Sequence, residues 1–313
     1  MAKVISFINM KGGVAKTTLT INVGEELANR GYRVLVIDMD PQFNATQSLL
    51  LYKAHKRDAV IDKSHNEIDN SVEVLEEDEI VKEMTSAEEY DALSKDKLTV
   101  LQFFQSTDIS EPPANPRLTQ EIAHNLDLIP GDLTLAKEIS GDTANKVGAV
   151  WDHLTNNNIV SDYDFILIDC PPTWSILTHS SLFASDYYII PSKVDFYSSI
   201  GIQLLEEQIA KKIKNDSVYK LTNRKLKRLG VIFTLVHRGI KAEETRMNNL
   251  KTKFPSIKFF SSNLPHMPSI PTKFVMYSDA RGDSKYDQLI NSIDKITTEI
   301  ESKIEEVVKS DEK

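Results

Sequence analysis

The sequence predicts an α/β fold in which a mostly parallel, twisted β-sheet is flanked by helices. Residues 4–38 contain an apolar run, a glycine pair, a helical pattern and a second apolar run, which together predict a βαβ unit. Further apolar runs recur along the chain at residues 126–132, 163–170, 186–191 and 229–236. Continuous runs of this kind are typical of strands that are buried on both faces of a parallel sheet.

Composition sets the broad class of the protein. The 313 residues suffice for one large α/β domain or two smaller ones, and a net charge of -9 argues against a wholly basic nucleic-acid binder. The single cysteine, Cys170, excludes a disulfide framework and a self-contained metal cluster, and it suits a reducing compartment. The chain shows neither a membrane-length apolar run nor a signal peptide before the first strand, so we expect a cytoplasmic protein.

Residues 4–18 carry the motif around which the rest of the sequence is interpreted. The apolar run leads into Gly12 and Gly13, then Lys16 and Thr17, and a helix is expected over residues 19–30. Amides of such a loop, followed by a helix N-terminus, form a cradle for anions. In this pattern the lysine reaches the β- and γ-phosphates and the threonine hydroxyl binds Mg²⁺. The strict phosphate-loop pattern fails, however, because Met10 and Ala15 replace its two glycines.

The remaining pattern, Lys-Gly-Gly-x-x-Lys-Thr-Thr, resembles the deviant Walker motif of the ParA/MinD family of dimerising ATPases. The resemblance implies that Lys11 reaches across a dimer to the nucleotide of the partner, and that Lys11 and Lys16 act in catalysis. Ala15 stands where the family more commonly has glycine. The nucleotide contacts implied within the loop are Lys11, Gly12, Gly13, Val14, Ala15, Lys16, Thr17 and Thr18.

A second motif follows the apolar run at residues 33–38. Residues 38–46 read Asp-Met-Asp-Pro-Gln-Phe-Asn-Ala-Thr, and functional groups of open parallel sheets gather at such strand ends. The run is similar to the second signature of the family, which implies that Asp40 positions the attacking water and Asp38 supports the Mg²⁺ shell. For Asp38 taken alone, capping of the next helix is a competing interpretation.

A third motif ends the run at residues 163–170. It has the form of a Walker B strand, so Asp169 is expected to hold Mg²⁺ together with Thr17 and Asp38. Pro171 and Pro172 stiffen a loop that can sense the γ-phosphate. We interpret Cys170 as a small buried apolar residue because no histidine or asparagine constellation marks it as a nucleophile.

The remaining residues complete the domain. Helices are expected at residues 47–56, 133–140, 145–156, 201–214, 242–254 and 286–309. Residues 98–104 fit a strand by periodicity, but the resemblance favours a short helix. Residues 53–97 are acidic and look like an insertion relative to the family, either a helical subdomain or a partly disordered loop. By resemblance, the segment 263–265 lies over adenine, with Thr234, Pro265 and Met267 as contacts, although His266 replaces the usual arginine.

Basic residues crowd between positions 211 and 258 of this acidic protein. Such a region is expected of a protein that binds a phosphate backbone, and a solvated helix face is the competing interpretation. The family binds DNA without sequence preference as ATP-bound dimers, for which phosphate contacts suffice. The candidate DNA contacts are Lys225, Lys227, Arg228, Arg238 and Lys241.

Together the motifs predict a single ATPase domain over residues 1–313 that uses ATP and Mg²⁺. The resemblance implies a DNA partition ATPase that forms a homodimer on binding ATP, binds non-specific DNA and hydrolyses slowly. A centromere-binding ParB-like partner would stimulate hydrolysis and so drive plasmid or chromosome segregation. One alternative is a nucleotide-gated DNA-binding protein or replication regulator with little turnover. Another is a MinD-like positioning ATPase, which the acidic residues 301–313 disfavour because an anionic membrane would repel them.

Overall fold

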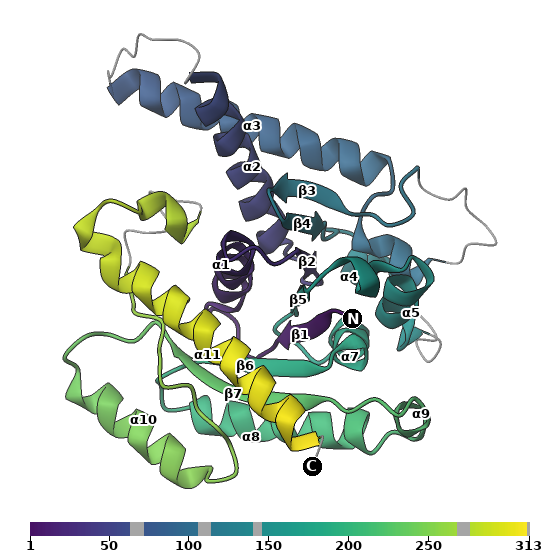
Figure 1. Ribbon diagram of the computed structural model, residues 1–313, viewed down its shortest axis with the longest axis vertical. Helices are drawn as coiled ribbons and strands as arrows, with labels where there is room; N and C mark the ends of the chain where they lie inside the picture. Colours follow the sequence, from purple (N-terminus) through teal and green to yellow (C-terminus); the bar gives the residue numbers. More distant parts are fainter. Residues whose placement is uncertain (63–71, 106–113, 140–145, 268–275, 312–313) are drawn as a thin grey trace.

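The protein is built around one seven-stranded sheet with helices on both faces (Figure 1). The computed structural model describes residues 1–62, 72–105, 114–139, 146–267 and 276–311. The strands lie in the order β3-β4-β2-β5-β1-β6-β7. Their bounds are β1 Lys3–Phe7, β2 Val34–Asp38, β3 Gln120–Ala123, β4 Leu126–Ile129, β5 Phe165–Asp169, β6 Tyr187–Lys193 and β7 Lys227–Thr234.

Every neighbouring pair of strands is parallel except β3 and β4. The predicted parallel sheet is therefore confirmed, and all five residues of β1, β2 and β5 are buried or nearly so, as continuous apolar strands require. The antiparallel edge strand β3 was not predicted, because Gln120–Ala123 holds no apolar run that separates it from a loop.

Two layers of helices cover the sheet. The core on one face packs residues of α1, α2 and α11 against the strands, and the core on the other packs residues of α5, α7 and α8. The longer helices are α1 Lys16–Asn29, α2 Asn44–Asp62, α3 Val72–Lys95, α5 Ala149–Asn156, α7 Ile176–Ala184, α8 Ser198–Ile209, α10 Lys241–Lys253 and α11 Asp287–Asp311. Short helices are α4 Leu135–Glu138, α6 Ile159–Asp162 and α9 Ser217–Leu221.

The expected insertion is helical where the structure describes it. Helix α2 continues to Asp62, beyond the predicted end at Lys56, and α3 runs antiparallel to it as the second half of a projecting pair (Figure 1). Residues 63–71 of the predicted insertion lie outside the described residues. The short helix expected at residues 98–104 is confirmed as a 3₁₀-helix at Val100–Phe104.

Two predicted helices were wrong in length. The helix expected at residues 133–140 is only the single turn Leu135–Glu138, because Asp132 Oδ1 accepts hydrogen bonds from the Thr134 amide and hydroxyl and fixes a turn there. The helix expected at residues 201–214 begins earlier, at Ser198, and ends in a π-helical turn over Ala210–Lys214. The final helix is confirmed, at Asp287–Asp311.

Candidate nucleotide site

The loop between β1 and α1 has the backbone of an anion cradle. Gly13 has φ 66° and Ala15 has φ 57°, so two successive reversals turn the amides toward the start of α1 at Lys16. A Cβ built on Gly12 meets no atom within 4 Å, which leaves the space above the loop open. Asn9 braces the loop, because its Nδ2 donates to Pro191 O (2.7 Å) and its Oδ1 accepts from the Lys11 amide (2.9 Å).

Lys16 is the strongest sign that this cradle holds an anion. The residue is only 6% exposed, yet its ammonium group makes neither a hydrogen bond nor an ion pair with any described residue. The charge of Lys16 interacts electrostatically with that of Asp169, but the ammonium group lacks a hydrogen-bond acceptor among the described residues, and a phosphate on the loop amides would supply one. The geometry thus fits a phosphate group at the N-terminus of α1.

Beside the loop, two carboxylates end neighbouring strands. In the register of β2 against β5, Asp38 lies opposite Asp169, and both are fully buried. Asp169 Oδ2 accepts a hydrogen bond from Thr17 Oγ1 (2.6 Å). Burial raises the pKa of Asp169 above its ordinary value. For Asp38, burial and then repulsion by Asp169 raise the pKa. A divalent cation at Thr17 and Asp169 would relieve this repulsion, so the donor set fits Mg²⁺.

Asp38 also has a structural role. Its Oδ2 accepts from the amide and the hydroxyl of Thr46 (both 2.8 Å), and its Oδ1 accepts from the Asp40 amide (3.2 Å). These bonds hold residues 38–46 in a tight loop, in which Asp40 is 5% exposed and close enough to Asp169 for its charge to raise the pKa of that carboxyl. The helix-capping interpretation of Asp38 therefore has support, because Thr46 lies in the first turn of α2.

Two further residues reach the loop from β6 and the segment after it. Lys193 was missed by the sequence analysis, yet its Nζ lies 3.9 Å from a Cβ built on Gly13. Lys11 forms an ion pair with Asp195 in the same chain. No sequence signal could have identified these neighbours, because they depend on how β6 lies beside β1.

The predicted base-contact residues lie at the end of β7. Thr234 Oγ1 donates to Val14 O (2.9 Å), which joins this strand to the phosphate loop. Pro265 pairs with Val236 in an isolated parallel bridge, and Met267 packs at the edge of the core that includes α1. The ring of His266 lies 4.4 Å from that of His237. Thr234 thus contacts the phosphate loop, whereas the role of Thr234, Pro265 and Met267 as adenine contacts stays a prediction.

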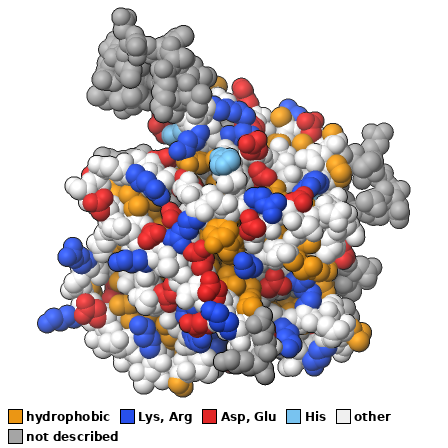
Figure 2. Space-filling view, in the orientation of Figure 1, with side chains coloured by type: hydrophobic (Ala, Val, Ile, Leu, Met, Phe, Trp, Pro, Cys, Tyr) orange, Lys and Arg blue, Asp and Glu red, His pale blue; other side chains and the backbone are white. Residues whose placement is uncertain are grey.

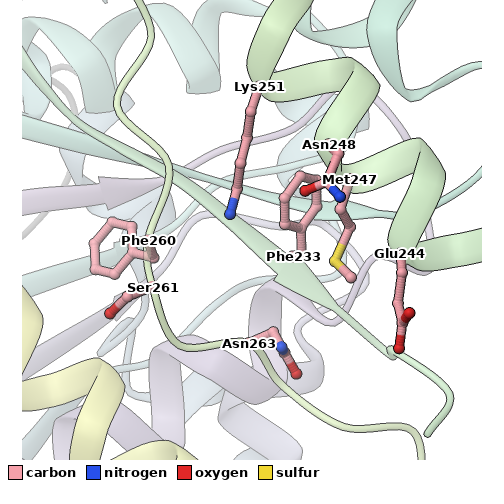
Figure 3. A pocket seen from close by; sticks show the side chains of 8 residues that line it. All are labelled: Phe233, Glu244, Met247, Asn248, Lys251, Phe260, Ser261 and Asn263. Atoms are coloured by element: carbon pink, nitrogen blue, oxygen red, sulfur yellow. The ribbon is translucent and has the colours of Figure 1, made fainter. Parts of the chain in front are cut away.

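A pocket of about 290 Å³ lies on the other side of β7 (Figure 3). Lys251 and Asn248 of α10 and Phe260 of the following segment point into it, together with Phe233 of β7. Side chains alternate along a strand, so Phe233 points away from the face on which Thr234 contacts the phosphate loop. Asn263, the first residue of the segment predicted to lie over adenine, also lines this pocket, so the pocket adjoins that part of the candidate nucleotide site.

The candidate DNA contacts do not form one open patch. Lys227 pairs with Asp311, and Arg228 pairs with Glu206, so both tie β7 to neighbouring helices. By contrast, Lys225, Arg238 and Lys241 are exposed and form no ion pair with described residues. On the face seen in Figure 2, basic and acidic side chains are interspersed.

Cys170 is confirmed as a buried apolar position. It is fully buried, and burial raises the pKa of its thiol to about 12, which leaves it protonated and unreactive. Within the described ranges, no helix has both the length and the apolar character that crossing a bilayer requires.

Comparison with known proteins places these features in context. The family AAA_31, an AAA domain, matches residues 2–227. The chain is 31% identical over 258 residues to the uncharacterized protein MJECL24 of Methanocaldococcus jannaschii, covering 81% of each chain. It is 29% identical to the chromosome partitioning protein ParA of Caulobacter vibrioides, covering 80% of this chain and 76% of the relative.

Solved structures share the fold. A Borrelia burgdorferi protein ascribed to plasmid partition, bound to AMPPNP, superposes with a TM-score of 0.64 at 21% identity, covering 96% of this chain and 99% of that one. Cobyrinic acid a,c-diamide synthase from Mycobacterium smegmatis, with a bound ATP analogue and magnesium, superposes with a TM-score of 0.63 at 20% identity, covering 95% and 93%. At these identities the likeness shows the fold alone.

Proposed function

The chain belongs to the AAA_31 family and is a P-loop ATPase of the ParA/MinD type, and on that premise we propose that it is a DNA partition ATPase that binds and hydrolyses ATP with Mg²⁺. The observation that carries this proposal is Lys16, a nearly buried lysine whose ammonium group has no hydrogen-bond acceptor among the described residues, beside an open loop of amides. ATP analogues and magnesium in structures of the same fold support the choice of ligand.

Each part of the site has a task in the proposed reaction. The amides of residues 12–18 and Lys16 hold the phosphates and offset the charge that develops on them. Thr17 and Asp169 would hold Mg²⁺, which supplies further charge neutralisation when bound, and Asp38 fixes the loop that carries Asp40. Asp40, which is buried in that loop and acts electrostatically on Asp169, orients the attacking water.

The surface around Lys11 suits a dimer that closes on ATP. Phe196 and Tyr197 are 78% and 70% exposed, and Ile200 and Leu204 on α8 are 53% and 50% exposed. Together they form an apolar surface directly after Asp195, the partner of Lys11. Apolar surface of this kind typically marks a site of protein association. A second protomer on this surface would bring its nucleotide within reach of Lys11.

DNA binding without sequence preference is the remaining part of the proposal. Lys225, Arg238 and Lys241 support it, since they are exposed and form no ion pair with described residues, and exposed cations are what phosphate contacts need. A closed dimer presents two such surfaces at a fixed separation, which raises avidity without new contacts. Hydrolysis, stimulated by a ParB-like centromere-binding partner, would open the dimer and release the DNA, and basal turnover would be slow.

Nucleotide binding is tested with a fluorescent ATP analogue. We expect Lys16→Ala to weaken binding at least tenfold, because it removes the lysine aimed at the phosphates. Lys295→Ala, an exposed lysine of α11, is the matched control and should bind as wild type. Equal affinity in both variants would contradict the assignment of the loop.

DNA binding is tested by measuring the affinity for duplex DNA at several salt concentrations, with ATP, with ADP and without nucleotide. Each neutralised phosphate contributes about -0.9 to the log–log slope on duplex DNA. We expect binding with ATP only, and a flatter slope when Lys225, Arg238 and Lys241 are replaced by alanine. A double variant of Lys137 and Lys295 is the control. Equal affinity in all three nucleotide states would refute the switch, and ATP-dependent DNA binding without turnover would favour a nucleotide-gated regulator.

A further inference from the structure

Helix α3 accounts for most of the protein's net negative charge. It holds nine carboxylates and two lysines, a net charge of -7 out of -9 for the whole chain. With the end of α2 it projects beyond the sheet at the top of Figure 1. The net negative charge is thus concentrated on an arm that projects from the sheet.

The side of α3 that faces α2 forms ion pairs with that helix. Glu89 pairs with Lys53 and Arg57 of α2, and Glu79 lies 3.7 Å from the ring of His55. Leu93 is buried in the core below. The inner side of α3 therefore has its partners within the chain.

The other side of α3 is an apolar ridge without a described partner. Ile80, Val81 and Met84 are 56%, 59% and 59% exposed. The exposed carboxylates Glu83 and Glu88 lie beside them, three or four residues along the helix. Adjacent large apolar side chains on a polar helix typically mark a surface that another protein covers.

The base of the arm touches the loop that carries Asp40. The ring of Tyr90 stacks on that of Phe43, with 4.7 Å between centroids and 25° between planes. The hydroxyl of Tyr90 accepts a hydrogen bond from the Leu133 amide (3.2 Å). Phe43 has φ 41°, which is sparsely populated for a residue with a side chain, and its amide donates to Asp40 O (2.8 Å). Movement of α3 would therefore shift the ring that packs on Phe43, a strained residue whose amide is hydrogen-bonded to the Asp40 carbonyl.

We propose that the outer side of α3 docks a basic amphipathic helix of a partner protein, and that the contact between Tyr90 and Phe43 carries this binding to the Asp40 loop. The apolar ridge fits the apolar face of such a helix, and the carboxylates fit its basic flanks. A second copy of α3 and nucleic acid both carry negative charge, so both are repelled. The effect on hydrolysis rests on the proposed ATPase function, whereas docking does not.

Docking is tested with a synthetic peptide of 18 residues that places leucines on one helical face and lysines on the other. A peptide of the same composition in shuffled order is its control. We expect the ordered peptide to bind at least tenfold more tightly, and Ile80→Ser with Met84→Ser to lose that difference. Leu221→Ser, which changes an 83% exposed leucine on α9, should bind as wild type. Equal affinity of wild type for the ordered and the shuffled peptide would overturn docking. Equal affinity of the ridge variant and of Leu221→Ser for the ordered peptide would overturn it as well.

Self-association is checked on the same proteins by sedimentation. If the ridge variant loses a dimer present in wild type without nucleotide, while peptide binding is unchanged, the occupant is a second copy and the proposal fails.

Coupling is read from hydrogen exchange of residues 40–46 with and without the peptide, and from ATP turnover. Tyr90→Phe keeps the stacked ring and should keep the exchange response. Tyr90→Leu should bind the peptide but lose the response, and a wild-type response in this variant would overturn the coupling. If neither wild type nor the Tyr90 variants hydrolyse ATP, the proposed ATPase function fails. Docking is still decided by peptide affinity, and coupling by hydrogen exchange of residues 40–46.

Discussion

Lys11 and Asp195 form an ion pair within one chain, although the family resemblance assigns Lys11 to the nucleotide of a partner. Burial alone would raise the pKa of Asp195, but hydrogen bonds from Lys11 and Ser198 outweigh it and lower the pKa. The ionised carboxylate therefore holds Lys11 in place. If Lys11 reaches the nucleotide of a partner, as the resemblance implies, this ion pair has to open when the dimer closes.

If Lys11 acts on the partner's nucleotide, two inactive variants should complement each other. Lys11→Ala lacks the reaching lysine and Asp40→Ala lacks the water-orienting carboxylate. In a mixed dimer one of the two sites keeps both groups, so turnover should partly return. An arginine finger, which acts similarly, contributes about 10³–10⁵ in rate. Turnover is measured across mixing ratios, and Lys295→Ala mixed with Asp40→Ala is the control for dilution. No recovery at any ratio would place Lys11 in its own site.

Asp40→Ala should separate nucleotide binding from hydrolysis. The substitution leaves Lys16 and the loop amides unchanged, so we expect ATP affinity within about twofold of wild type. Turnover should fall by roughly 10²–10⁴, the usual contribution of a group that positions or activates the reacting water. The ATP dimer should then persist, which size-exclusion chromatography with ATP would show. Turnover at the wild-type rate would rule out this role.

Lys193 should be a phosphate contact that the motifs do not contain. Its Nζ is close to Gly13, and it forms no ion pair with described residues. A charge-assisted hydrogen bond contributes about 1.5–3 kcal/mol, so Lys193→Ala should weaken ATP binding roughly ten- to hundredfold. The loss should be smaller for ADP if the contact is to the γ-phosphate. Lys193→Arg should retain part of the affinity, and titration of ATP and ADP with all three proteins would show whether it does.

The sequence predicted the centre of the site better than its margins, for a physical reason. Parallel strands end at one edge of the sheet, so motifs at the ends of β1, β2 and β5 had to meet there, and Asp38 does lie opposite Asp169. Lys193 is the last residue of β6 and Asp195 lies just after it, and this strand carries no motif. Their position depends on the register of β6, which the apolar pattern of residues 186–191 does not specify.

The basic region shows the same limit. Lys227 and Arg228 looked equivalent to Lys225 in sequence, but their partners are 84 and 22 residues away, in α11 and α8. Only the packing of those helices against β7 shows that Lys227 and Arg228 form ion pairs, whereas Lys225 forms none with a described residue. The antiparallel strand β3 was missed for a related reason, since pairing with β4 rather than apolar content makes it a strand.

Glu25 should make stability depend on pH. It is 6% exposed in α1, where Tyr52 Oη donates to its Oε1 (2.5 Å) and Ser278 Oγ also donates. Burial outweighs these bonds and raises the pKa of Glu25 above its ordinary value of 4.5. The folded state then binds the proton more tightly than the unfolded state does. This contribution to stability is fully present below pH 4.5 and is lost as pH rises through the folded pKa.

Glu25→Gln keeps the acceptor oxygen and removes the titration. We therefore expect urea unfolding to show that wild type loses more stability than the variant as pH rises from 5 to 8, with the variant the more stable of the two at pH 8. Glu121→Gln, at an exposed position of β3, is the matched control and should follow wild type. Parallel pH profiles for wild type and Glu25→Gln would show that Glu25 titrates alike in the folded and unfolded states, so that the hydrogen bonds from Tyr52 and Ser278 fully offset its burial.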